Sequence, residues 1–600
     1  MKRKQRYSGG GVPSVEAILR LRRVTIGISL VVSILVFRLW SLQFLEGEQY
    51  RERSVANYEQ RVEILSQRGS ILDRNMNPLV EDIRNYNLFF NTAHHPTSDE
   101  LSRTLVTLSE ITGKSEKYLR NRLTGRQPDH RGRRLILEGI SFPTMVAIGE
   151  RALVLPGIVM EPVPGRNHRY GDLAAHVLGR DGEIDAARLE QSRERGYGLG
   201  DRIGMSGVEY TYEESLRGRD GWQIIQTDSL GRQRDVLRVE RPPQAGKDIV
   251  LSLDLGLQKK AEEILGASKG VIIALDPRTG AVLTMASSPR YDPNTFQKEY
   301  VHLIQDRSHP LTNRAIAGLY APGSVFKIFE AFGLVEEGIV NEHTRVSCPG
   351  QFSLGGDAVW RCWKKYGHGP VGLVEALRIS CDVFFYQTAG RGLKKAKIAT
   401  WARNFHLGML TGIDLPYEKA EPFPPRNMKR SWYPGDTINA SIGQGFVLVT
   451  PIEIAAAAAA VANGGTLYAP HVAAGVIDSS SKYAPIRPIP PQITGTVKAS
   501  PKTWKLVTEG LWEVVNAPNG TGRRCYIEGF PMMGKTGTAE VGGRDPHAWF
   551  VCFGPVRDDN TPEIVVVVLL EHGGHGGESA SPLAKEFLEF YLNGGREIIA

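Results

Sequence analysis

The chain has 600 residues, 41% of them hydrophobic and 23% charged, so it exceeds one ordinary domain and can fill several packed cores. This composition excludes a largely disordered chain. The formal net charge of +8 suits an anionic membrane surface, an anionic substrate or nucleic acid. No zinc-finger spacing, basic helix or RNA-binding motif accompanies the charge, so we do not expect nucleic acid as a partner.

The N-terminal segment joins a basic stretch to an apolar run. Residues 1–23 carry seven Lys or Arg and one acid, and residues 24–45 are predominantly apolar, with Arg38 as the one charged residue. The run reaches the length of about 20 residues that a membrane span needs if Arg38 extends to the outer interface beside Trp40. No small-x-small cleavage site follows, which disfavours a removed signal peptide. Since the cations precede the run, we predict a cytoplasmic tail, one helix in the cytoplasmic (inner) membrane and an exported remainder.

Two textures follow the predicted membrane helix. Residues 46–250 are rich in Arg and Glu and poor in long apolar runs, which indicates a mixed, extended, non-catalytic module. Residues 251–600 show strand patterns near both ends, at 270–276, 281–286, 548–553 and 563–570, and helical patterns at 255–265 and 581–592. Strands at both ends with helices between them predict one sheet with a helical insertion, an α/β or α+β domain.

Ser324 and Lys327 form a Ser-x-x-Lys pair at the start of a predicted helix. A Pro-Gly pair precedes them, which puts Ser324 near a helix N-terminus and Lys327 one turn further on the same face. A serine hydroxyl becomes a nucleophile when a base takes its proton, and a lysine amine with a lowered pKa can act as that base. The N–H groups of a helix N-terminus suit a developing oxyanion. The pattern alone is weak evidence, because Ser479 and Lys482 repeat it in a Ser-rich segment.

Two further motifs follow in the chain. Ser380-Cys-Asp382 precedes an apolar run, and Lys535-Thr-Gly-Thr538 reads as a strand in which Gly537 lets a ligand approach the backbone. The order Ser-x-x-Lys, Ser-x-Asp, Lys-Thr-Gly is the signature of serine penicilloyl transferases. Together the three motifs are strongly specific.

With these motifs the sequence resembles a class B penicillin-binding protein, a D,D-transpeptidase of peptidoglycan, over nearly its whole length. The resemblance implies a penicillin-binding, serine β-lactamase-like domain over 251–600 with a central antiparallel sheet flanked by helices. It also implies an elongated pedestal, similar to a dimerisation domain, over 46–250. No separate glycosyltransferase module is present, which indicates a monofunctional enzyme. Other segments that resemble family motifs are Arg68–Asn75, Arg169–Gly179, Ser206–Glu209, Asp276–Gly280, Tyr291–Asn294, Gly435–Asn439 and Gly443–Gly445.

Within the class, the sequence resembles most the elongation branch, penicillin-binding protein 2. The basis is Trp363–Gly369, Asp382 where division enzymes usually carry Asn, and the glycine-rich segment Gly573–Gly577. This implies a role in cell elongation and rod shape, with a division enzyme as the alternative. A non-catalytic penicillin-binding sensor or scaffold is disfavoured by the intact motifs and the single predicted span. A carboxypeptidase or β-lactamase is disfavoured by the long pedestal.

The resemblance implies a role for each motif residue. Ser324 attacks the penultimate D-alanine carbonyl of a donor stem peptide and becomes acylated, and Lys327 takes its proton. Ser380 relays protons to the leaving D-alanine and from the amine of the acceptor peptide. β-Lactams acylate the same serine, which makes the protein an antibiotic target.

The Lys-Thr-Gly strand is expected to bind the donor. By resemblance, Lys535 holds its terminal carboxylate with help from Thr536 and Thr538, and the peptide lies beside the strand like an added strand. The backbone N–H groups of Ser324 and Thr538 form the oxyanion hole. Asp382 in place of Asn leaves open which residue binds the peptide amide.

Three cysteines and a histidine gather within a short stretch, namely Cys348, Cys362, His368 and Cys381. They offer the four ligands that tetrahedral zinc takes. A disulfide between two of the cysteines, small buried residues and a plain loop histidine are the alternatives. Some elongation-type relatives bind a metal at corresponding places, which favours zinc. Because Cys381 lies inside the Ser-x-Asp motif, zinc would brace Ser380 and take no part in the chemistry. No cofactor is expected for catalysis.

The resemblance also implies partners besides the stem peptides. Elongation-type members work with a glycan polymerase of the RodA kind and with MreC-like scaffold proteins. We expect these contacts on the membrane helix and the pedestal.

Overall fold

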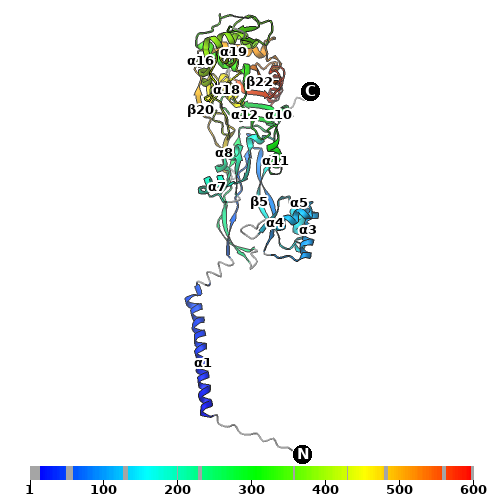
Figure 1. The fold of residues 1–600 in the computed structure, drawn as a ribbon, viewed down its shortest axis with the longest axis vertical. Helices are drawn as coiled ribbons and strands as arrows, with labels where there is room; N and C mark the ends of the chain where they lie inside the picture. The colour runs from blue at the N-terminus through cyan, green and yellow to red at the C-terminus, as the bar shows by residue number, and fades with distance from the viewer. Residues whose placement is uncertain are drawn as a thin grey trace, which may run out of the picture. The chain divides into compact units, whose positions relative to one another are not determined.

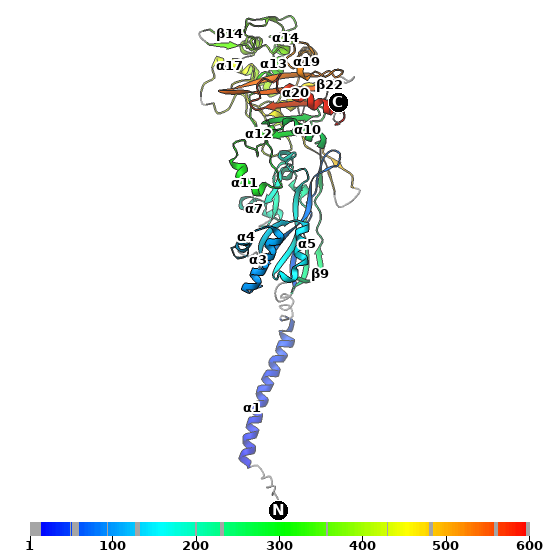
Figure 2. The same cartoon turned by 90° about the vertical axis from the view of Figure 1, so that its right-hand side faces the viewer.

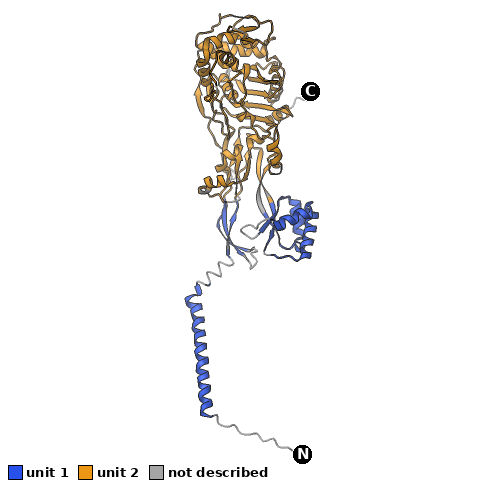
Figure 3. Cartoon of the chain, in the orientation of Figure 1, with its two compact units in different colours: residues 1–65, 86–161, 220–243 blue, residues 66–85, 162–219, 244–600 orange. Residues whose placement is uncertain are grey.

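The computed structural model describes all residues except 1–13, 49, 51–58, 93, 126–132, 199–200, 228–232, 356–357, 429, 479–483, 557–561 and 596–600. The chain forms two compact units (Figure 3). Unit 1 comprises residues 1–65, 86–161 and 220–243, and unit 2 comprises 66–85, 162–219 and 244–600. The segment predicted as a pedestal, 46–250, is therefore shared between the two units. The chance Ser-x-x-Lys match at Ser479 and Lys482 lies outside the described residues.

Unit 1 begins with a long apolar helix (Figure 1). α1 (Val15–Trp40) continues into the π-helical turn η1 (Ser41–Leu45), and no residue in its most apolar window, of mean hydropathy 2.0, is buried. Within the described residues it is the one helix long and apolar enough to cross a membrane. It is compatible with a single-pass anchor. The helix begins at Val15, within the segment 1–23 predicted as a cytoplasmic tail, because its backbone hydrogen bonding extends beyond the apolar run.

The rest of unit 1 contains a small helical layer and two groups of strands. β1 (Glu59–Ile64), β8 (Gly221–Thr227) and β9 (Gln233–Arg241) form an antiparallel sheet in that order. The end of β3 (Pro78–Asn91) pairs with β4 (Arg133–Ile140). The helical elements are α3 (Ser98–Thr112), α4 (Glu116–Gly125), α5 (Phe142–Glu150) and η2 (Ala152–Val154). Leucine and isoleucine side chains from these elements form a separate core.

The first segments of unit 2 are short. They are β2 (Ile71–Leu72), β5 (Ile158–His168, which begins in unit 1), α6 (Ala175–Leu178), β6 (Arg180–Glu183), α7 (Ala186–Ser192), η3 (Arg193–Arg195), β7 (Arg202–Ser206), α8 (Gly207–Thr211), α9 (Glu213–Leu216) and β10 (Asp248–Leu251). β10 pairs in parallel with β2 and antiparallel with β18 (Ala473–Ile477), which pairs in turn with β19 (Arg487–Pro488).

Buried ion pairs join these short segments. Arg68 contacts Glu209 and Glu213 at 2.6 Å each, and Arg166 contacts Glu209 at 2.6 Å and Asp82 at 3.0 Å. Burial by itself would raise the pKa of Glu209, but the guanidinium groups of Arg166 and Arg68 hold that pKa below its usual value. Arg68 and Glu209 come from two of the family-like motifs, so the fold brings those motifs together.

A five-stranded antiparallel sheet forms the centre of unit 2 (Figure 2). Its order is β12-β11-β23-β22-β21. The strands are β11 (Gly270–Leu275), β12 (Val282–Ser288), β21 (Met533–Val541), β22 (Arg544–Val556) and β23 (Pro562–Leu570). Two strands come from the beginning of the domain and three from its end. This confirms the predicted sheet with a helical insertion.

Helices cover both faces of this sheet. Residues alternate along β11 between two apolar clusters, with Ile273 in one and Ile272 in the other, as the two-residue period of a strand requires. α10 (Leu255–Leu265) and α20 (Ala580–Leu592) contribute to the second cluster. α18 (Pro451–Ala462), which holds the alanine run, is buried along its whole length within the first.

The insertion between β12 and β21 supplies most of the helices. It contains α11 (Phe296–Gln305), α12 (Arg314–Ala317), η4 (Gly323–Phe326), α13 (Lys327–Glu336), α14 (Leu373–Arg378), α15 (Asp382–Phe385), η5 (Tyr386–Leu393), α16 (Lys394–Asn404), α17 (Pro434–Ala440), α19 (Pro501–Asn516) and η6 (Arg523–Cys525). Its remaining strands form two-stranded ladders and are β13 (Val346–Cys348), β14 (Gln351–Ser353), β15 (Val359–Arg361), β16 (Gly369–Val371), β17 (Thr466–Tyr468) and β20 (Ile493–Thr496).

Candidate active site

Ser324 and Lys327 lie where a tight turn becomes a helix. Ser324 is half-buried in the 3₁₀ turn η4, and Lys327 is the first residue of α13. The side chain of Lys327 is fully buried, and its Nζ donates to Asp382 Oδ1 at 2.6 Å and to Ser380 O at 3.2 Å. The Ser-x-x-Lys pair thus meets the Ser-x-Asp motif, as its position in the family signature implies.

Ser380 sits between α14 and α15 in an unusual backbone conformation. Its φ is +54°, which costs free energy for any residue except glycine and persists only where the surroundings enforce it. The side chain is buried, and Ser380 Oγ accepts a hydrogen bond of 2.8 Å from Lys535 Nζ. The carbonyl of the same residue accepts from Lys327. Ser380 therefore bridges the two motif lysines.

Lys535 belongs to β21, the edge strand of the central sheet. It is fully buried, and burial lowers the pKa of its amine well below the ordinary 10.5, with a smaller contribution from the charge of Lys327. A lysine with a lowered pKa holds its proton weakly. Lys535 Nζ and Ser380 Oγ, which share a hydrogen bond, can therefore exchange a proton within the site.

The rest of the Lys-Thr-Gly motif packs tightly. A Cβ on Gly537 would lie 2.8 Å from Pro322 O and 2.9 Å from Val325 Cγ2, so the glycine lets the strand approach the turn that carries Ser324. The sequence predicts that Gly537 lets a ligand approach the backbone of the strand. In the structure it is the η4 turn that approaches the strand at this glycine. Thr536 Oγ1 donates to Thr521 Oγ1 at 2.9 Å, and Thr538 is half-buried at the strand edge.

Two residues near the motifs had no predicted role. Thr521 donates to Arg378 O through both its N–H and its hydroxyl, at 3.2 Å each, and accepts from Thr536. It therefore ties the strand to the helix that leads into Ser380. Gln444 Nε2 donates to Thr538 O at 3.1 Å. Gln444 lies in Gly443–Gly445, one of the segments that resemble family motifs. The only signal in the sequence at Thr521 is that it stands between two glycines.

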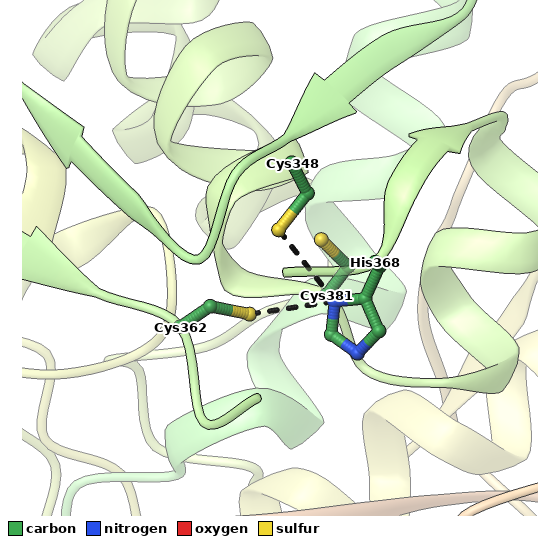
Figure 4. A group of neighbouring side chains, drawn as sticks. All are labelled: Cys348, Cys362, His368 and Cys381. Atoms are coloured by element: carbon green, nitrogen blue, oxygen red, sulfur yellow. Dashed lines mark hydrogen bonds between the residues drawn. The ribbon is translucent and has the colours of Figure 1, made fainter. Parts of the chain in front are cut away.

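The four predicted metal ligands converge (Figure 4). Cys348 Sγ and Cys362 Sγ each lie 3.6 Å from His368 Nδ1, and the ligand atoms of all four residues, Cys381 included, lie within 4.8 Å of one another. Ligands at tetrahedral zinc bond lengths would place sulfur and nitrogen about 3.6 Å apart. All five cysteines of the chain are free thiols. The cluster can hold a metal ion.

Electrostatics within the cluster favour a thiolate. The pKa of Cys362 is lowered, chiefly because the Cys381 thiol donates a hydrogen bond to it, and the pKa of Cys381 is raised by the same bond. Thiolates are the form in which cysteines bind metals.

The fold and the site together define a serine acyltransferase of the penicillin-binding kind. Residues 270–589 match the penicillin-binding protein transpeptidase domain, and residues 63–251 match the penicillin-binding protein dimerisation domain. The chain belongs to the class B penicillin-binding proteins and is a peptidoglycan D,D-transpeptidase.

Relatives of similar length support this assignment. The chain is 32% identical to the peptidoglycan D,D-transpeptidase MrdA of Haemophilus influenzae, over 95% of this chain and 90% of the relative. It is 33% identical to MrdA of Acinetobacter baumannii, over 95% and 87%.

Solved structures agree. The penicillin-binding protein PBP2 in a complex with MreC from Helicobacter pylori is 28% identical, with a TM-score of 0.76 over 89% of this chain and 99% of that one. A chain from a structure on coordination of polymerisation and crosslinking by a peptidoglycan synthase complex is 31% identical, with a TM-score of 0.73 over 97% and 100%.

Proposed function

We propose that Ser324 is the nucleophile and Lys327 its general base. Ser324 Oγ attacks the carbonyl carbon of the penultimate D-alanine of a donor stem peptide while its proton passes to Lys327. The tetrahedral intermediate collapses with loss of the terminal D-alanine, whose nitrogen takes a proton through Ser380. The observation that carries this assignment is that both motif lysines contact Ser380, next to the turn that holds the half-buried Ser324.

In the second half-reaction the amine of an acceptor stem peptide attacks the acyl-enzyme. The amine loses a proton through Ser380, the new amide bond forms, and Ser324 leaves with its hydroxyl restored. The backbone N–H groups of Ser324 and Thr538 stabilise the oxyanion in both steps. Lys535 and Thr538 bind the terminal carboxylate of the donor, whereas Gly537 provides the close approach of the strand to Ser324.

Labelled penicillin tests the nucleophile directly. We expect the purified full chain in detergent to form a covalent adduct that peptide mapping places on Ser324, and the Ser324→Ala variant to form none. The matched control is Ser353→Ala, a serine on the two-stranded ladder β14–β15, which should label like wild type. An adduct of unchanged amount in Ser324→Ala, or none on wild type, would contradict the assignment.

We assign the enzyme to cell elongation, with support from the MrdA relatives over nearly the whole chain. Depletion should produce rounded cells. Filaments would instead indicate the division role.

The proposed orientation follows the charge distribution. The basic N-terminal side faces the cytoplasm, the helix within Val15–Leu45 spans the inner membrane, and unit 2 lies outside. A cysteine-reactive, membrane-impermeant label should reach a cysteine introduced at Ser353 in intact spheroplasts, but not one introduced at Ser8. The reverse pattern would refute the orientation.

We further propose an MreC-like scaffold and a RodA-type polymerase as partners, because similar chains occur in complexes of these kinds. Unit 1 offers exposed apolar side chains on α5 and η2, including Phe142 at 67% and Leu153 at 99% exposure. Leu153→Asp should weaken co-purification with the scaffold, while Glu150→Gln at the neighbouring helix end should not. Equal binding of both variants would place the contact elsewhere.

Zinc is our proposal for the metal cluster, held by Cys348, Cys362, His368 and Cys381. Zinc would brace the loop that carries Ser380 and supply no chemistry to the reaction. Freshly purified protein should contain about one zinc per chain, and Cys362→Ser should lose it and melt at a lower temperature. Protein without zinc and with Cys348 disulfide-linked to Cys362 would refute the site.

A further inference from the structure

Asp382 cannot bind a peptide carbonyl by donating a hydrogen bond. Its Oδ1 accepts from Lys327 Nζ at 2.6 Å, and its Oδ2 accepts from the backbone N–H of Trp363 at 3.2 Å. Both carboxyl oxygens of Asp382 thus act as acceptors within the protein, and the side chain has no N–H group to offer a peptide carbonyl. A peptide bond laid in the site therefore needs another donor for its carbonyl oxygen.

Gln444 carries a side-chain amide into the same region. It lies between Gly443 and Gly445, which have φ values of +68° and +71° and form a tight turn. Gly443 O accepts from the N–H of Gly323, the residue before the proposed nucleophile, at 2.9 Å. A Cβ on Gly443 would lie 2.3 Å from Gly323 O, so any residue larger than glycine at position 443 would clash with the turn before Ser324. The turn is thus fastened to the nucleophile's own turn.

The hydrogen bond of Gln444 also shows which way Thr538 faces. β21 has a free edge, because it is the last strand of the sheet. Gln444 Nε2 donates to Thr538 O, and a Cβ on Gly323 would lie 2.4 Å from the same oxygen, so this carbonyl faces the two turns that carry Gln444 and Gly323. The N–H and C=O of one residue in a strand point to the same side. The N–H of Thr538, which we assign to the oxyanion hole, and the amide of Gln444 therefore lie along one edge.

Gln444 has hydrogen-bonding capacity beyond this contact. An amide nitrogen carries two hydrogens, and among the described residues Thr538 O is the one acceptor that bonds to Nε2. The side chain is half-buried, so a ligand can reach it. One N–H fixes the side chain, and the second can serve a peptide laid along the edge.

We propose that Gln444 binds the donor stem peptide by donating from Nε2 to the carbonyl oxygen of the peptide bond that precedes the attacked D-alanine. Gln444 thereby supplies the amide contact that Asp382 cannot make. This inference rests on the proposed nucleophile Ser324 and names a substrate-binding residue of the same site. It explains why a glutamine directly follows Gly443, the glycine that is hydrogen-bonded to Gly323.

Two penicillins that differ in one group test the contact. Benzylpenicillin carries a side-chain amide, and 6-aminopenicillanic acid has an amine in its place. Second-order acylation rates of the detergent-solubilised full chain are measured for both by competition with a fluorescent penicillin. We expect Gln444→Met to slow benzylpenicillin about 3- to 10-fold, the value of one neutral hydrogen bond, and to leave 6-aminopenicillanic acid within about twofold of wild type.

Further variants separate the possible outcomes. Gln444→Glu keeps the shape without an N–H donor and should change the ratio of the two rates in the same direction, so the test survives if the Met variant folds poorly. Gln351→Met, an exposed glutamine on β14, should change neither rate. Equal slowing of both penicillins, or no change in either, would overturn the proposal. Labelling of Ser324→Ala by either compound would instead overturn the proposed nucleophile.

Discussion

Glu330 is a buried acid that the proposed mechanism does not use. It follows Lys327 by one turn in α13, is 1% exposed, and neither carboxyl oxygen has a hydrogen-bond partner within the described residues. Burial raises the pKa of its carboxyl well above the ordinary 4.5, and the charge of Lys327 opposes this only in part. The folded protein therefore keeps a proton that the unfolded chain releases.

The sign of the pH effect follows from that proton. Between the unfolded pKa and the raised folded pKa, the unfolded chain binds one proton fewer than the folded chain, so the free energy of unfolding falls as pH rises. Its slope is about 1.4 kcal/mol per pH unit for this group. Glu330→Gln has the shape of the protonated acid but does not titrate. The variant should match wild type near pH 4.5 and become more stable than wild type by about 1.4 kcal/mol for each pH unit above it.

Urea unfolding at pH 5, 6 and 7 measures this difference. Tryptophan fluorescence can follow it, because Trp401 packs close enough to α13 that a Cβ on Gly333 would touch its ring. The control is Glu299→Gln, an exposed acid on α11, which should keep a constant difference from wild type. Stability curves of wild type and Glu330→Gln that run parallel from pH 5 to 7 would refute the reasoning.

Three other predictions rest on buried contacts. Lys535→Met should abolish acylation. Because burial lowers the pKa of Lys535, the folded wild type should gain stability as pH rises towards 10.5, and the variant should lack this gain. An unchanged pH slope in urea unfolding would contradict this. Thr521→Val should slow penicillin acylation about 3- to 10-fold, because the Thr536 hydroxyl loses the oxygen that accepts its hydrogen bond. Thr521→Ser keeps that oxygen and should restore the rate. Equal rates in both variants would refute a role of Thr521 in positioning the Lys-Thr-Gly strand. Arg166→Met should lower the free energy of unfolding by about 3 kcal/mol, because it removes a partner of the buried Glu209. Since the pKa of Glu209 is lowered in the folded protein, this stabilisation should fade as pH falls below about 4.5. A loss that persists undiminished at pH 3 would argue against it.

Local patterns in the sequence were enough to predict the central domain. The continuous apolar pattern of 270–276 and 563–570 is that of strands buried on both faces, and both are strands of the central sheet. The three short motifs predicted the site because each requires particular residue types at fixed local spacing. The cluster of Cys348, Cys362 and Cys381 was visible for the same reason.

Tertiary structure alone decided how these parts meet. Lys327 and Lys535 contact Ser380 across 53 and 155 residues of sequence, and no local period encodes such a contact. The division of 46–250 between two units likewise depends on which segments pack together.

The sequence by itself determined the class of fold and the three family motifs, and it predicted the Cys/His cluster, because these follow from residue type and spacing. The structure decided that Gln444 faces Thr538, that Glu330 is enclosed and that the pKa of Lys535 is lowered. Those properties depend on desolvation and on hydrogen bonds between distant segments, which exist only once the chain has packed.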